Sequence, residues 1–139
     1  MVSAMASKHT GGAVHTDRVA VVRYMVADVQ AAADFYIQHL GFRMERTWGR
    51  PFASLSRGDL ELWLSGPESS AARPMPSGDK PEPGGWNRLV IQVDDLTATV
   101  QQMKAVGIRF RNEIVSGPGG KQILAEDPSG NPVELFQPA

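Results

Sequence analysis

The stretch Ala125-Glu126-Asp127-Pro128-Ser129-Gly130-Asn131-Pro132-Val133-Glu134-Leu135-Phe136 decides the fold of this 139-residue chain. Residues 127–131 are turn formers, because Pro presets φ while Gly and Asn tolerate positive φ. The residues after the turn alternate in the manner of a β-strand, with Glu134 between Val133 and Leu135. Because burying an unpaired charge is costly, Glu134 must point away from the apolar core. We therefore expect a β-hairpin whose Glu134 faces either bulk water or a polar-lined cavity.

Two earlier stretches follow one common plan. Residues 19–27 alternate as a strand, Asp28 is suited to cap a helix, residues 29–40 carry an apolar stripe at helical spacing, and Gly41 ends it. Residues 89–93 then alternate again, Asp95 caps a second helix, and Gly107 ends that one. The pattern predicts a strand followed by an Asp-capped helix in each half.

Strand-like segments follow each predicted helix, at residues 43–48, 52–57 and 60–64 in the first half and at about 109–115, 122–126 and 132–136 in the second. The Gly-rich run 117–120 lies between two of them and reads as a hairpin turn. The residues that end the two predicted helices agree as well, since Leu40-Gly41-Phe42-Arg43 matches Val106-Gly107-Ile108-Arg109. The chain is therefore predicted to be an internal repeat of one supersecondary unit.

Composition narrows the classes of function. The net charge of −1 gives no bulk attraction for nucleic acid or an anionic membrane. The chain has no cysteine, which excludes disulfides and thiolate catalysis, and it has no apolar run of the roughly 18 residues that span a membrane. We expect residues 1–17, with His9 and His15, to be a disordered tail, and the protein to be cytoplasmic.

The repeat and its motifs resemble the vicinal oxygen chelate superfamily, which holds glyoxalase I, extradiol dioxygenases and bleomycin-resistance proteins. The similarity rests on Val26-Ala27-Asp28 with Phe35-Tyr36, on Val93-Asp94-Asp95, and on the terminal Asp127-Pro128-Ser129-Gly130-Asn131 with Glu134. It implies an α+β fold of two tandem βαβββ modules that form curved mixed sheets around a shared cavity. One such domain would cover residues 18–138, with module one at 19–65, a loop at 66–86 and module two at 87–137. The resemblance also implies a homodimer.

Metal-using members of this family carry four ligands that face the cavity. The resemblance assigns these places to Val21, Glu61, Arg88 and Glu134. Valine has no lone pair and arginine has only donors, so Val21 and Arg88 cannot ligate a metal. We therefore predict that the metal site has been lost, with no cofactor, and that Arg88 pairs with Glu134 or with Glu61. His39, near the end of the first helix, reads as a solvated residue of its last turn.

Three hypotheses of function remain open. The first is a metal-free protein of the bleomycin-resistance type that binds a small organic ligand between the modules. Its ligand-binding residues are predicted to be Val21, Arg23, Met25, Phe52, Glu61, Trp63, Arg88, Gln92, Glu134 and Phe136. The loop Ser65–Gly85 would be either a flap over this ligand or a plain linker. By contrast, Arg43, Glu45 and Arg46 read as a solvated strand face.

The second hypothesis is a metal-dependent lyase, isomerase or dioxygenase that recruits its metal through Glu61 and Glu134, with help from Gln92 or a partner chain. The third is a metal-free enzyme. There Glu61 or Glu134 would act as a general base in a dry pocket, and Arg88 would hold an anionic substrate or stabilise an enolate. The sequence does not separate this third reading from simple binding.

Overall fold

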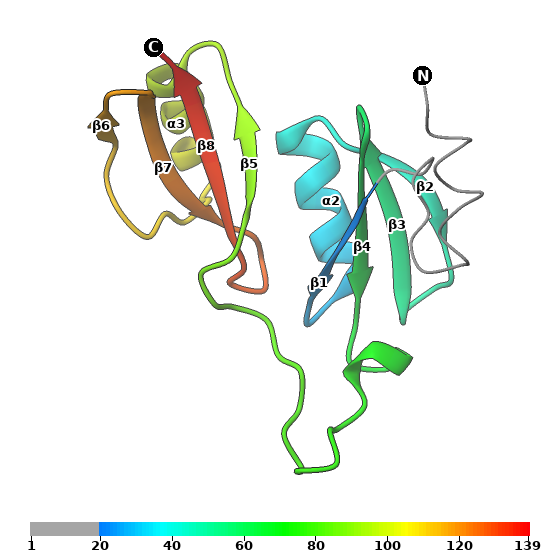
Figure 1. The fold of residues 1–139 in the computed structure, drawn as a ribbon. Helices are drawn as coiled ribbons and strands as arrows, with labels where there is room; N and C mark the ends of the chain where they lie inside the picture. Colours follow the sequence, from blue (N-terminus) through cyan, green and yellow to red (C-terminus); the bar gives the residue numbers. More distant parts are fainter. Residues whose placement is uncertain (1–19) are drawn as a thin grey trace, which may run out of the picture.

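A computed structural model describes residues 20–139 of the chain, so the expectations for residues 1–17, for His9 and His15 and for Val19 lie outside the described residues. The order of elements is β1 (Val21–Met25), α2 (Val29–Leu40), β2 (Arg43–Thr47), β3 (Phe52–Arg57), β4 (Leu60–Ser65), η1 (Ser70–Ala72), β5 (Leu89–Gln92), α3 (Leu96–Ala105), β6 (Val115–Gly117), β7 (Gly120–Glu126) and β8 (Pro132–Pro138). The predicted tandem βαβββ architecture is confirmed (Figure 1).

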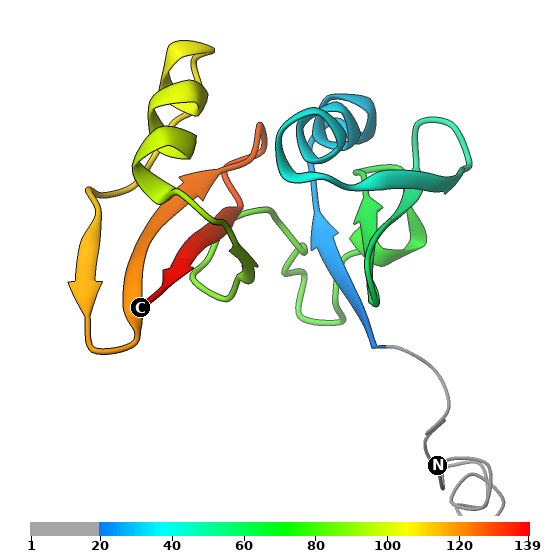
Figure 2. The same cartoon turned by 90° about the horizontal axis from the view of Figure 1, so that it is seen from above.

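Each module forms its own four-stranded mixed sheet, in the order β1-β4-β3-β2 in the first and β5-β8-β7-β6 in the second. In both sheets the first strand pairs parallel with the last, and the remaining pairs are antiparallel. Helix α2 packs on β2, β3 and β4, while α3 packs on β8. The two helices lie on the same side of the two sheets (Figure 2). We call the opposite face of each sheet its helix-free face.

The two helices begin and end as the sequence predicts. The carboxylates of Asp28 and Asp95 accept hydrogen bonds of 3.0 Å from the backbone amides of Ala31 and Ala98. Gly41 adopts a left-handed conformation with φ of 74°, and the amide of Phe42 donates to the carbonyl of Tyr36. At the end of α3 the amides of Gly107 and Ile108 donate to the carbonyls of Lys104 and Met103, both at 3.0 Å. These two bonds form a Schellman motif, which satisfies carbonyls that the end of a helix leaves free.

One predicted strand is wrong. Instead of a strand over residues 109–115, the chain forms an isolated bridge between Phe110 and Ala125, and β6 begins only at Val115. The side chain of Asn112 explains the interruption, because its Oδ1 accepts the Leu124 amide at 2.9 Å in place of a backbone carbonyl. The Gly117–Gly120 hairpin turn is confirmed, since those two residues pair across it.

The core is one hydrophobic cluster drawn from both modules. Alternation along the strands supplies it: Leu62 and Leu64 of β4 and Val133 and Leu135 of β8 are fully buried. The residues between them therefore project onto the helix-free faces, where the candidate site lies.

Candidate functional site

The predicted ion pair forms at the start of module two. Nε and Nη2 of Arg88 donate to Oε1 of Glu134 at 3.1 and 2.9 Å. The Glu134 side chain is 10% exposed and the Arg88 side chain is 29% exposed, so the pair is largely shielded from solvent. Charge-assisted bonds of this kind are among the stronger hydrogen bonds in proteins. Of the two partners that the sequence left open for Arg88, the structure selects Glu134.

Glu61, the corresponding carboxylate of module one, has other partners. Its Oε2 accepts hydrogen bonds from Nε1 of Trp63 at 2.7 Å and from the hydroxyl of Ser54 at 3.0 Å. Ser54 was not predicted as a site residue. Strand register explains its place, because Ser54 lies opposite Trp63 across the β3–β4 pair, so the two side chains share one face.

Val21, Glu61, Arg88 and Glu134 together do not provide the ligand set of a divalent ion, since only the two glutamates can donate an electron pair. In the parallel pairs, Val21 lies opposite Glu61 and Val90 lies opposite Glu134, so neither carboxylate faces a ligand across its strand pair. Arg88 reaches Glu134 diagonally and brings a permanent positive charge to it. Within residues 20–139, moreover, no three His, Asp or Glu side chains gather closely enough to hold a metal ion. The described residues therefore supply at most two carboxylates at these positions.

A hollow of about 340 Å³ lies where the two modules meet. Arg23 and Met25 of β1 line it together with Arg88 of module two, Glu82 and Gly84 of the connecting loop, and Asn131. The structure thus joins three of the predicted ligand-binding residues in one space. Gln92 and Phe136 lie opposite each other on the β5–β8 pair, farther along the face that carries Glu134.

A second hollow, of about 220 Å³, lies on the helix-free face of module one. Three of its residues were predicted, namely Phe52, Glu61 and Trp63, and Arg46, Trp48 and Ser54 complete it. We call it the aromatic hollow. Arg46 is exposed, as predicted for the solvated face of this strand, and it also lines this hollow, where it lies 5.5 Å from the centre of the Trp48 ring. Strand β2 has an irregularity between Met44 and Arg46, which side-chain alternation in the sequence could not reveal.

A third hollow, of about 660 Å³ and thus larger than these two, lies at the start of α2 and contains none of the predicted site residues. Its two carboxylates already have partners, since Asp28 caps the helix and Glu68 lies 3.6 Å from Arg50. No aromatic ring lines it. We therefore place the candidate site at the two smaller hollows, although they enclose less volume.

Tyr24 positions the Arg88–Glu134 pair. Its hydroxyl accepts from the amide of Leu89 at 2.8 Å and donates to the carbonyl of Pro132 at 2.9 Å, so it holds the starts of β5 and β8 together. Burial raises the pKa of Tyr24 to about 12, and the negative charge of Asp127 adds to this, while the Leu89 amide and Arg88 act in the opposite direction. Tyr24 is therefore a neutral hydrogen-bonding residue at ordinary pH.

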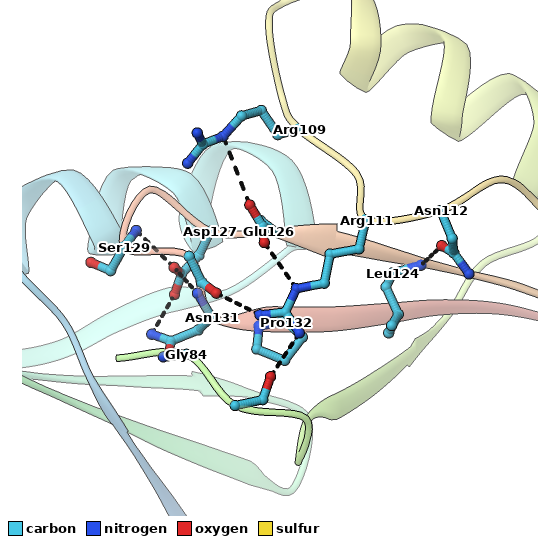
Figure 3. Close-up of polar contacts among 12 residues, drawn as sticks. Gly84, Arg109, Arg111, Asn112, Leu124, Glu126, Asp127, Ser129, Asn131 and Pro132 are labelled. Atoms are coloured by element: carbon cyan, nitrogen blue, oxygen red, sulfur yellow. Dashed lines mark hydrogen bonds and ion pairs between the residues drawn. The ribbon is translucent and has the colours of Figure 1, made fainter. Parts of the chain in front are cut away.

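The turn between β7 and β8 is a buried network around Asp127 (Figure 3). Asp127 Oδ1 accepts from the amides of Ser129 and Asn131 at 2.8 and 2.9 Å, and Oδ2 accepts from Asn131 Nδ2 at 3.0 Å and from the Tyr36 hydroxyl at 2.8 Å. Asn131 also bonds Met25 and Gly84. The turn predicted from its local residues thus joins α2, β1 and the loop of residues 66–86.

Arg111 secures the other side of the same turn. Its guanidinium donates to Glu126 Oε2 at 2.8 Å and to the carbonyls of Gly85 and Gly130 at 2.7 and 2.9 Å (Figure 3). It also lies 4.7 Å from the centre of the Trp86 ring, whose residue is 68% exposed. The end of the loop is therefore fixed to module two next to Arg88. Whether its middle acts as a flap stays a prediction.

These paired βαβββ modules, each with a carboxylate on the helix-free face of its last strand, define the class of the protein. The sequence model of the Glyoxalase/Bleomycin resistance protein/Dioxygenase superfamily matches residues 15–135. The chain therefore belongs to this superfamily, as the sequence motifs predicted. Within residues 20–139, no helix is both long enough and apolar enough to cross a membrane.

Individual relatives differ in what their names describe. A probable chloroplastic lactoylglutathione lyase of Arabidopsis thaliana is 32% identical over 127 residues, which are 86% of this chain but 35% of that protein. The chain thus spans about a third of the length of this relative. A lactoylglutathione lyase from Agrobacterium tumefaciens superposes with a TM-score of 0.65 at 20% identity, covering 87% of this chain and 93% of that one. TnmS3, an antibiotic binding protein from Streptomyces sp. CB03234, superposes with a TM-score of 0.65 at 24% sequence identity. That match covers 91% of this chain and 98% of TnmS3.

Proposed function

We propose that this protein binds a small organic ligand on the helix-free faces of its two modules without using a metal ion. The observation that carries the proposal is the pair of hydrogen bonds from Arg88 to one carboxylate oxygen of Glu134. At the position of Arg88, a metal-using relative would carry a metal ligand. In this chain the guanidinium of Arg88 itself provides the positive charge beside Glu134. The aromatic hollow and the hollow between the modules provide apolar walls with a few charged groups, as small-ligand sites do.

A metal-dependent lyase is the alternative, and the 32% identity to the Arabidopsis protein favours it. It requires Glu61 and Glu134 to bind a metal although Val21, Val90 and Arg88 surround them. Elemental analysis of the chain, prepared without a histidine tag from medium containing Mn, Fe, Ni and Zn, separates the two. We expect much less than one metal per chain. A stoichiometric divalent ion that Glu61→Ala and Glu134→Ala each remove would overturn the proposal.

A gain-of-function variant sharpens this test. The double substitution Val21→His, Arg88→His places imidazole ligands at the two positions that lack them. We expect zinc to raise the melting temperature of the double variant and to leave that of the original chain unchanged, because a ligand that binds only the folded state stabilises it. Zinc stabilisation of the original chain itself would contradict the proposal.

Ligand binding itself is tested by a thermal-shift screen of planar and polar natural products, with tryptophan fluorescence as the second readout. A true ligand raises the melting temperature in proportion to the logarithm of its concentration. Arg88→Met and Trp63→Ala should reduce that shift. A screen without any stabilising compound would count against the proposal.

We also propose that the protein is a homodimer. Three valines project from the helix-free faces and are 39–52% exposed, namely Val21, Val90 and Val115. Exposed apolar side chains of this kind favour association when a partner covers them. Sedimentation analysis should give twice the chain mass, and Val90→Asp should shift it toward the monomer. The cytoplasmic location stays a prediction.

A further inference from the structure

The aromatic hollow of module one presents three aromatic rings in sequence. The ring centres of Trp48 and Phe52 are 5.3 Å apart, and those of Phe52 and Trp63 are 5.5 Å apart. Trp48 is 57% exposed, which is unusual for a large aromatic side chain unless it has a partner to cover it. Neighbouring rings are inclined at 54° and 73° to each other, so they form an angled aromatic wall that can contact an aromatic ligand face-on and edge-on.

The polar groups of the hollow offer one acceptor and one set of donors. Both hydrogen bonds to Glu61 end on its Oε2, and among residues 20–139 none reaches its Oε1. Arg46 has no carboxylate within 4.0 Å and makes no side-chain hydrogen bond in the described part of the chain, so its N–H groups are available. Glu45 lies nearby, but it is bound by Arg43 and Ser56. A ligand that satisfies both groups must carry a donor and an acceptor oxygen.

The charge of the ligand follows from which ring faces are already used. Arg46 lies over the ring of Trp48 at 5.5 Å, and Arg23 lies over the ring of Trp63 at 5.0 Å. Two of the three rings thus already hold a cation of the chain, which is the contact that a cationic ligand would seek. An ammonium group entering the hollow would meet these guanidinium groups as like charges. The hollow therefore disfavours cations.

The size of the hollow limits how much of a ligand it holds. Its volume of about 220 Å³ is below the roughly 300–1,000 Å³ typical of sites that enclose a whole drug-sized molecule. It accommodates one fused-ring portion of a ligand, and the remainder extends over the open face.

Building on the proposed function, we propose that the aromatic hollow binds a flat aromatic group bearing a hydroxyl beside a carboxylate or carbonyl oxygen. The rings of Trp48, Phe52 and Trp63 contact it with the faces and edges that the arginines leave open. Its hydroxyl donates to Oε1 of Glu61, and its acceptor oxygen accepts from the N–H groups of Arg46. The ligand class is a neutral or anionic hydroxyaryl carbonyl compound.

The test uses the chain's three tryptophans as reporters. The full chain, labelled with ¹⁵N, is titrated with 3-hydroxy-2-naphthoate, 2-naphthoate and 2-naphthylmethylammonium, and the indole N–H signals are assigned with single Trp→Phe variants. We expect 3-hydroxy-2-naphthoate to move the Trp48 and Trp63 signals and to leave Trp86 in place, since Trp86 lies in the other module against Arg111. It should bind roughly tenfold more tightly than 2-naphthoate, as loss of one hydrogen bond to a charged group predicts.

Matched variants test the two polar contacts. Arg46→Gln should weaken 3-hydroxy-2-naphthoate about tenfold, whereas Arg109→Gln, an exposed arginine of module two, should not change its affinity. Equal or tighter binding of the ammonium compound would overturn the ligand class and leave the binding function standing. Binding that moves only the Trp86 signal, or no binding by any of the three probes, would overturn the site. In that case the separate ligand screen still decides whether the protein binds a ligand at all.

Discussion

At the scale of single residues, the pair of Arg88 and Glu134 shows how a neighbouring side chain determines whether a carboxylate is available to a ligand. Glu134 is 8% exposed, so without a partner it would be a nearly buried charge. Arg88 satisfies it with two hydrogen bonds to one oxygen. The ion pair therefore compensates for the partial desolvation of the Glu134 carboxylate. It also leaves fewer of that carboxylate's lone pairs free to bind a metal.

This predicts an unusual order of stabilities. Arg88→Met leaves Glu134 unpaired and should lower the free energy of unfolding by about 2–3 kcal/mol, less than for a fully buried pair because Arg88 is partly exposed. The double variant Arg88→Met, Glu134→Leu should be more stable than Arg88→Met alone, because it removes the orphaned charge. Urea unfolding measures both.

Arg109→Met serves as the control for that experiment. Its side chain is 72% exposed and lies 3.8 Å from Glu126, so the change should cost less than about 0.5 kcal/mol. A double variant that is less stable than Arg88→Met would show that Glu134 is stabilised by something other than this pair.

Whether the contacts of a residue could be predicted depends on whether nearby residues in the sequence determine them. That Arg88 pairs with Glu134 or with Glu61 was predicted from charge and strand position, and the structure has the pair with Glu134. The exposure of Arg46 was predicted, but its place opposite Ser54 was not, because an irregularity in β2 sets its face and no pattern of hydrophobicity marks it. Tyr36 and Asp127 are 91 residues apart, so their contact depends on docking of the modules and not on either segment.

At the scale of elements, the helices were the easiest to predict. The first helix was expected over residues 29–40, and α2 spans those residues, because Asp28 and Gly41 both act within one turn of its ends. The segment 109–115 failed as a strand because Asn112 competes with backbone pairing through its side chain. Alternation alone does not report such competition.

The cap of α3 gives a direct test at this scale. Asp95→Ala removes the acceptor of the Ala98 amide and should lower the free energy of unfolding by about 1 kcal/mol. Asp94→Ala is the matched control, since Asp94 is exposed and is not the N-cap residue, and its effect should stay within about 0.5 kcal/mol. Equal losses from both variants would mean that general charge, and not capping, stabilises the helix.

The β6–β7 hairpin offers a second test. Gly120 has φ of 148°, and a Cβ there would lie 2.1 Å from the carbonyl oxygen of Gln137. Gly120→Ala should therefore cost about 3 kcal/mol, from strain and from loss of the β7–β8 pairing. Gly119→Ala, whose Cβ would meet nothing nearer than Phe136 at 3.9 Å, should be nearly neutral. Thermal unfolding of the two variants distinguishes them, and a small effect of Gly120→Ala would contradict the described register.

At the scale of the whole molecule, the two modules are joined by polar contacts around two tyrosines. Tyr24 bonds the starts of β5 and β8, and Tyr36 bonds Asp127 in the β7–β8 turn. The hollow that contains Arg23, Met25 and Arg88 lies at the same junction. Its shape therefore depends on this docking, and any loosening of the junction should weaken ligand binding there.

Alkaline titration tests the junction, because the chain contains only these two tyrosines. Burial raises the pKa of Tyr24 to about 12 and raises that of Tyr36 further, Asp127 adding to both. In the unfolded chain both ionise near pH 10, so above that pH the unfolded state holds fewer protons than the folded one. Stability is complete below pH 10 and should fall by up to about 1.4 kcal/mol per pH unit for each tyrosine as the pH rises toward 12.

Two measurements check this expectation. Ultraviolet absorbance should show little tyrosinate in the folded chain through pH 11, and urea unfolding between pH 9 and pH 11 should show the decline. Tyr24→Phe should reduce the slope to the share of Tyr36, although it lowers stability at every pH because the Leu89 amide and the Pro132 carbonyl lose their partner. If the tyrosines of the folded chain ionised near pH 10, they would lie in water, and the modules could not dock through them.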